Sequence, residues 1–138
     1  MSSNDCIFCK IVDGQIPSIK VYEDDAVVAF LDIGPLSDGH TLVIPKAHYD
    51  RFDQCPPEVA AAIAAVATKV AKAVASSMNC DGYNVLCNNG LAAGQLVDHV
   101  HFHIIPRNDG DGVFNSWPAH SYEQGRAEAI AAKILEKM

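Results

Sequence analysis

Three histidines, His99, His101 and His103, alternate with the apolar residues Val100 and Phe102. In a β-strand alternate side chains point to the same face, so this spacing predicts three imidazoles on one face of a strand and apolar residues on the other. On a helix the same spacing would scatter the rings around the axis. Near neutral pH an imidazole can act as a nucleophile, a proton shuttle, a metal ligand or a hydrogen-bond donor to phosphate.

The length of this strand limits what the three rings can do together. At a rise of about 3.3 Å per residue the outer two histidines lie about 13 Å apart, whereas zinc binds an imidazole nitrogen at about 2.0 to 2.1 Å. One metal ion therefore cannot bind all three rings, although a neighbouring pair could share one. Alternatively, the three histidines could be ordinary half-polar residues on the exposed face of an edge strand. Their strict alternation beside a glycine-containing loop disfavours this interpretation.

Cysteines provide a second set of reactive side chains. Cys6 and Cys9 form a C-x-x-C pair, which is half of a zinc-finger-like ligand set or, alternatively, two free thiols. Cys55, Cys80 and Cys87 stand alone and are expected to be small core or turn residues. The total of five is odd, which suits a chain whose thiols are reduced inside a cell.

Composition restricts the class of protein. A chain of 138 residues with 49% hydrophobic and 20% charged residues fits one globular domain. Its 10 basic and 17 acidic residues give a net charge of −7, which disfavours nucleic acids and anionic membranes as partners. The start of the chain lacks the features of a signal peptide, and the longest apolar run, 59–67, is about half of a membrane span. We expect a soluble, cytoplasmic protein.

The elements that position the histidines follow from the remaining pattern. A short helix and turn is predicted over 7–17, a long amphipathic helix from Pro56–Pro57 onward, and a C-terminal helix over 123–138. The β-rich runs are 20–23, 26–32, 40–44, 83–88 and 99–105. Strands joined largely by turns, with one inserted helix, predict an antiparallel α+β domain.

The segment His99–Ile105 resembles the H-φ-H-φ-H-φ-φ signature of the histidine triad (HIT) superfamily, where φ is an apolar residue. Other blocks match the family in the same order: Cys6–Ile11, Tyr22–Asp25, Phe30–Ile33, Gly39–His48 and Gly94–Gln95. The resemblance covers about 6–118 of a single 1–138 domain and leaves 119–138 as a C-terminal tail. The sequence resembles the Hint-like branch, including bacterial HIT proteins, more than the nucleotidyltransferase branch.

This resemblance implies a fold and a reaction. The fold is a five-stranded antiparallel sheet with one long helix, assembled as a two-fold dimer. The reaction is hydrolysis at the α-phosphorus of nucleoside phosphoramidates or related conjugates, through a covalent nucleotidyl-histidine, with release of AMP or GMP. His101 would be the nucleophile, the carbonyl of His99 would orient its ring, and His103 would contact the α-phosphate. No cofactor is required for this catalysis.

The resemblance also assigns a nucleotide site. Asn88 and Gln95 would contact the phosphate, Gly94 would let the loop backbone come close, and Asp32 would bind the ribose hydroxyls. An apolar slot for the purine would be lined by Ile7, Phe8, Ile11, Phe30 and Ile33. Considered singly, these apolar residues are also typical of an ordinary core.

The resemblance also bears on several residues outside the nucleotide site. Cys6, Cys9, His48 and His99 would form a structural Cys2His2 zinc site, which leaves His101 and His103 free for catalysis.

Leu96 stands where the Hint-like pattern often carries serine or threonine, so the preferred leaving group is open. Trp117–Pro118 resembles a Trp-Pro that can approach the active site across the dimer, whereas alone it would be a packed loop. His40 is expected near the site, and His120 has no assigned role.

Two alternatives to a phosphoramidase remain open at this point. Ile105-Pro-Arg107 also resembles the Fhit-like branch, whose members hydrolyse dinucleoside polyphosphates. A nucleotide-binding regulatory or scaffold protein is the alternative outside enzymes, and the intact triad disfavours it because binding alone does not need His101.

Overall fold

The computed structural model describes residues 5–114 and 116–138 of the chain. Residues 1–4, where part of a signal peptide would lie, are outside the described residues. Five antiparallel strands form one sheet in the order β1-β2-β3-β5-β4. They are β1 Lys20–Glu23, β2 Val27–Leu31, β3 Thr41–Pro45, β4 Gly82–Leu86 and β5 Phe102–Arg107. The predicted α+β class and the five-stranded sheet are confirmed.

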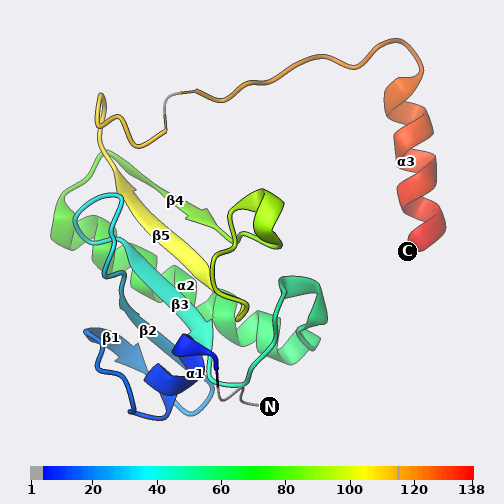
Figure 1. Ribbon diagram of the computed structural model, residues 1–138. Helices are drawn as coiled ribbons and strands as arrows, with labels where there is room; N and C mark the ends of the chain where they lie inside the picture. The colour runs from blue at the N-terminus through cyan, green and yellow to red at the C-terminus, as the bar shows by residue number, and fades with distance from the viewer. Residues whose placement is uncertain (1–4, 115) are drawn as a thin grey trace.

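The helix α2, Pro57–Met78, covers one face of this sheet (Figure 1). It begins at a proline, which suits the first turn because the amide there has no partner within the helix. Its apolar stripe, which includes Ile63 and Val70, packs on Val27, Val43 and Ile104 of the sheet. By length and composition alone α2 could cross a membrane, but here it is the main helix of the core.

The opposite face of the sheet carries the short helix α1, Ile7–Val12. Phe8 and Ile11 of α1 pack with Phe30 of β2 and Leu42 of β3 in a second apolar cluster. The central strands are therefore buried on both sides, and they read as continuous apolar runs. Two short 3-10 turns, Phe52–Gln54 and Leu91–Ala93, lie in the connecting loops.

The strand predicted over 99–105 is wrong at its beginning, because β5 starts only at Phe102. The amide of His99 donates to the carbonyl of Val97 at 2.9 Å, and that of Val100 donates to the carbonyl of Tyr49 at 2.7 Å. His99 and Val100 therefore bond outside the ladder, which begins at Phe102 opposite Val43. The other predicted strands agree with the structure to within two residues.

The register places the third histidine on the α1 face of the sheet. His103 lies opposite Leu42 of β3 and Leu86 of β4. Residues directly opposite each other in an antiparallel pair share a face, and Leu42 belongs to the cluster under α1. The triad therefore combines one strand residue with two residues of the preceding loop.

The C-terminal helix α3, Arg126–Lys137, is present within the predicted range and stands apart from the sheet (Figure 1). Residues 116–122 form an extended segment that leads to it (Figure 1). α3 has no buried residue, and Ile134 and Leu135 are 55% and 70% exposed. An amphipathic helix normally buries its apolar side, so α3 lacks a packing surface within the described part of its own chain.

Candidate active site

His101 is held by a hydrogen bond to the backbone of its neighbour in the triad. Its Nδ1 lies 2.7 Å from the carbonyl oxygen of His99. Because a carbonyl only accepts, Nδ1 carries the proton and Nε2 carries the free lone pair. The ring is 5% exposed, and burial lowers its pKa below the ordinary 6.5. At neutral pH His101 is therefore an uncharged imidazole with an available nucleophilic nitrogen.

A cavity of 280 Å³ lies between α1, β2 and the triad. His101 and His103 line one part of it, and Gly94 and Leu96 line another. All five residues predicted for the apolar slot line this cavity: Ile7, Phe8, Ile11, Phe30 and Ile33. The ring of Phe8 packs edge-on against that of His101, with centroids 5.1 Å apart. The apolar residues and the nucleophilic ring of His101 thus line the same cavity.

The acidic residue expected at the ribose, Asp32, also lines this cavity. Its Oδ1 accepts the amide of Gly34 at 2.8 Å, and its Oδ2 lies 3.6 Å from Nε2 of His40. Its side chain is 23% exposed, so the carboxylate can still accept hydrogen bonds from a ligand.

The structure places the two predicted phosphate contacts outside the lining of this cavity. Gln95 is buried, and its Nε2 donates to the carbonyls of Asp50 at 2.6 Å and Val97 at 3.1 Å. Its Oε1 accepts the amide of Gly90 at 2.8 Å. The side chain of Gln95 is thereby occupied in fixing the loop.

Asn88 has a similar place beside the loop. Its Nδ2 lies 3.5 Å from the carbonyl of Gly94, and a Cβ added at Gly94 would come 3.4 Å from the same nitrogen. Gly94 has φ +94, a conformation that favours glycine. In the structure Asn88 and Gln95 shape the loop, and Gly94 is one of the residues here that line the cavity.

A fourth histidine lies beside the triad. Nε2 of His40 is 2.9 Å from Nδ1 of His103, and the ring is 2% exposed. Burial and the neighbouring rings of His101 and His40 lower the pKa of His103 to about 4. The sequence indicated only that His40 is close, because its partner is 63 residues away in the chain.

Cys6, Cys9, His48 and His99 come together at the edge of the site, with their possible ligand atoms all within 4.8 Å of one another. Nδ1 of His99 is 3.4 Å from Sγ of Cys6, and Nδ1 of His48 is 3.3 Å from Sγ of Cys9. The two Nδ1 atoms are 3.2 Å apart. Tetrahedral zinc with bonds of about 2.0 to 2.3 Å separates its ligand atoms by about 3.3 to 3.8 Å. The four side chains fit such an ion.

The outer nitrogens of both rings support the same assignment. Nε2 of His99 lies 2.8 Å from the carbonyl of Pro45 and so carries the proton. Nε2 of His48 lies 2.8 Å from Oδ1 of Asp50 and can donate to it. Both Nδ1 atoms then present lone pairs toward the cysteines, as metal-binding histidines do.

A family model described as "HIT domain" matches residues 13–110. The chain belongs to the HIT domain family. The adenosine 5'-monophosphoramidase of Schizosaccharomyces pombe is 45% identical to it, over 96% of this chain and 98% of the relative.

Solved HIT structures share its fold. A HIT family protein from Bacillus anthracis has a TM-score of 0.91 and 44% identity, with 99% of both chains covered. A zinc-bound histidine triad family protein from Mycobacterium smegmatis has a TM-score of 0.76 and 38% identity, covering 99% of this chain and 100% of its own.

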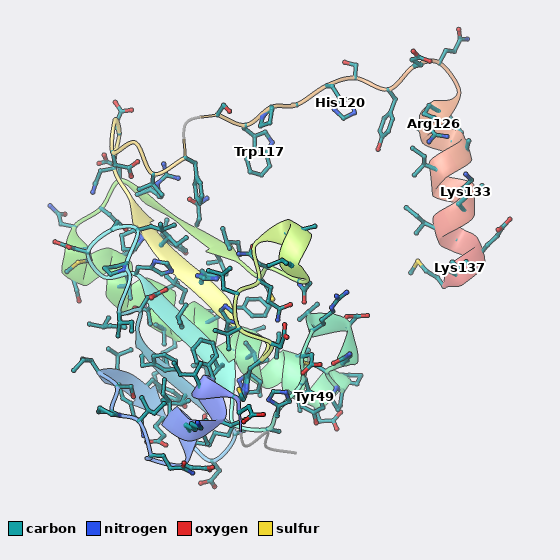
Figure 2. All side chains as sticks on the ribbon, viewed as in Figure 1. Tyr49, Trp117, His120, Arg126, Lys133 and Lys137 are labelled. Carbon is teal, nitrogen blue, oxygen red and sulfur yellow. The ribbon has the colours of Figure 1, made fainter. Side chains whose placement is uncertain are left out.

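One residue of this HIT domain lies outside the cavity that the resemblance would have it approach. Trp117 is 90% exposed on the C-terminal segment that carries His120 and leads to α3 (Figure 2), where it lines a pocket with Asn84 and Leu86 of β4. It is not among the residues that line the cavity at His101. Leu96, which stands in place of a hydroxyl residue, is 85% exposed at the cavity.

Proposed function

We propose that this HIT protein hydrolyses purine nucleoside phosphoramidates or related nucleotidyl conjugates at the α-phosphorus. The observation that carries the proposal is the bond from Nδ1–H of His101 to the carbonyl of His99 at 2.7 Å. It leaves a neutral, bare Nε2 on a ring that lines an apolar cavity. A nucleotide-binding scaffold has no need for a nucleophile prepared in this way.

The reaction proceeds in two displacements. The lone pair on Nε2 of His101 forms a bond to the α-phosphorus while the bond from phosphorus to the leaving amine breaks, and the amine takes up a proton from solvent. Water then attacks phosphorus and gives up one proton to solvent, the phosphorus–imidazole bond breaks, and the nucleoside monophosphate leaves. In the intermediate Nδ1–H still donates to the carbonyl of His99, which stabilises the positive charge on the substituted ring.

Substrate selection follows from the lining of the cavity. The apolar residues around Phe8 and Phe30 take the purine, Asp32 binds the ribose, and Gly94 lets the loop backbone come close to the phosphate. The relative from Schizosaccharomyces pombe, an adenosine 5'-monophosphoramidase, belongs to the same class of enzyme. Asn88 and Gln95 act in this proposal by holding the loop.

The experiment is a substrate panel on the parent and on His101→Ala. It contains adenosine phosphoramidate, an AMP–lysine conjugate and a diadenosine polyphosphate. We expect the parent to prefer the first two and the variant to lose kcat by several orders of magnitude, with AMP binding retained. Equal rates for the two proteins would exclude His101 as the nucleophile. A preference for the diadenosine polyphosphate would favour the Fhit-like alternative.

We propose further that Cys6, Cys9, His48 and His99 hold a structural zinc ion. Such an ion would cross-link α1, the loop after β3 and the start of the triad, and it takes no part in the reaction. Its four positions are filled by protein ligands, which is typical of a closed structural site. No cofactor for catalysis is part of the proposal.

A homodimer in the cytoplasm completes the proposal. The alignment with the Bacillus anthracis structure covers 99% of the chain at a TM-score of 0.91, so the extended segment and α3 have a similar place there. A helix with an exposed apolar side needs an external partner to hold that place. The outer edge of β4, with Tyr83 and Val85 each about half exposed, offers unpaired backbone for a second sheet.

A further inference from the structure

One nitrogen of the triad is buried without a hydrogen-bond partner among the described residues. It is Nε2 of His103, in a ring that lines the cavity. A buried polar group without a partner destabilises the fold, so its presence at a cavity indicates a partner that arrives with the ligand. What this nitrogen can offer depends on whether it carries a proton.

The ring of His40, the neighbour of His103, has its orientation fixed by the backbone. Nδ1 of His40 lies 3.1 Å from the amide nitrogen of Leu36, in donor geometry. An amide N–H only donates, so Nδ1 of His40 must accept and cannot carry a proton. Burial lowers the pKa of His40, so the ring is neutral and its single proton is on Nε2.

That proton determines the state of His103. Nε2–H of His40 is 2.9 Å from Nδ1 of His103 and 3.6 Å from Oδ2 of Asp32. The shorter contact is the hydrogen bond, and it requires a lone pair on Nδ1 of His103. Since His103 is neutral as well, with a pKa of about 4, its own proton is on Nε2.

We propose that His40 is a positioning residue that holds His103 in the Nε2–H form, as a neutral hydrogen-bond donor to the phosphoryl group or its leaving atom. This inference rests on the proposed function. His101 is held in the opposite form, with Nδ1–H bound to His99 and Nε2 bare. The two rings, 4.9 Å apart, thus present one nucleophile and one donor, whereas two bare nitrogens would both repel the anionic phosphate oxygens.

The same protonation pattern separates the two groups of possible metal ligands. Asp32, His40 and His103 also have ligand atoms within 4.8 Å of one another. However, the nitrogen that His40 directs toward the other two residues carries the proton, so it has no lone pair for a metal. In the cluster with Cys6 and Cys9, by contrast, the inward nitrogens are bare.

The test reads the tautomers directly. Long-range ¹H–¹⁵N correlation spectra of the imidazoles at pH 7.5 distinguish a protonated nitrogen from a bare one. We expect Nε2–H for His40 and His103 and Nδ1–H for His101 in the parent protein. In His40→Leu we expect His103 to populate both neutral forms, because its fixed donor is lost. His120→Leu, at an exposed histidine of the C-terminal segment, is the matched control and should leave the signals of His103 unchanged.

Kinetics on adenosine phosphoramidate give a second readout. His40→Leu should lower kcat about tenfold or more with little change in KM, which is less than the ~10² to 10³ for removing a preorganised donor outright. His40→Gln keeps an N–H at the place of Nε2 and should recover most of the rate. Equal losses in the two variants would mean that His40 acts only through packing.

The spectrum of the parent decides the proposal even if a variant fails to fold. His103 found as Nδ1–H, or as a cation at pH 7.5, would overturn it. An unchanged His103 tautomer in a folded His40→Leu would overturn it too. If the parent hydrolyses no member of the substrate panel, the proposed function fails, while the tautomer measurement still stands by itself.

Discussion

The carbonyl oxygen of His99 accepts the Nδ1 proton of His101 at 2.7 Å, while the ring of His99 faces Cys6 and Cys9. One residue therefore joins the cysteine cluster through its side chain and orients the nucleophile through its backbone. The ring of His99 is fully buried and bonded to Pro45 on its other side. Any change that lets this ring move also moves the acceptor that fixes the tautomer of His101.

Metal removal should consequently affect both stability and rate. We expect Cys9→Ser to reduce bound zinc, to lower Tm by more than about 5 °C, and to lower kcat because the carbonyl of His99 loses its fixed position. Elemental analysis of protein purified without chelator, thermal unfolding and single-substrate kinetics measure the three effects. Cys80→Ser, at a lone half-buried cysteine, is the control and should change none of them. A zinc content near zero in the parent would contradict the metal site.

Acid should destabilise the protein partly through His103. Burial, with His101 and His40 nearby, lowers its folded pKa to about 4 from an ordinary 6.5, against the opposing carboxylate of Asp32. Between these values the unfolded chain binds more protons than the folded one, so the free energy of unfolding falls as the pH falls from about 6.5 to about 4. Urea unfolding at several pH values should give a flatter dependence for His103→Gln. Parallel curves for the two proteins would contradict the low pKa.

Two isoleucines, one in the core and one at the binding cavity, should respond differently to truncation. Ile63 of α2 is fully buried, and Ile63→Ala should lower the free energy of unfolding by about 2 to 5 kcal/mol because it leaves a void. Ile33 is 94% exposed at the cavity, and Ile33→Ala should change stability by less than about 0.5 kcal/mol while raising KM for purine substrates. Denaturant unfolding and steady-state kinetics on both variants test the pair. A stability loss at Ile33 would place it in the core.

The oligomeric state should depend on α3. We expect a dimer by light scattering at micromolar concentration, and dissociation when charge is placed on the exposed apolar side of α3 by Ile134→Glu with Leu135→Glu. Ile19→Glu, at a residue 66% exposed before β1, is the control and should keep the mass of the parent. A monomeric parent, or a double variant with unchanged mass, would contradict this role of α3.

Much of the fold could be predicted from local pattern. The apolar runs of β2 and β3 and the helical stripe of α2 depend on neighbours in the chain, so their positions follow from periodicity. The start of β5 could not be predicted, because the hydrogen bond from Val100 to Tyr49 joins segments 51 residues apart. The hydrogen bond from the side chain of Gln95 to the carbonyl of Asp50 could not be predicted either, since the two residues are 45 positions apart.

The sequence by itself determined which chemical groups this protein has: the alternating imidazoles, the paired thiols, and an acidic balance that disfavours polyanionic partners. Only the tertiary structure decided what each group can do. The cluster of Cys6 with His99 joins residues 93 positions apart, and the protonation of each ring is set by distant backbone groups such as the amide of Leu36 and the carbonyl of Pro45. An imidazole is a donor at one nitrogen and an acceptor at the other, so its role is fixed only once the fold supplies the partner.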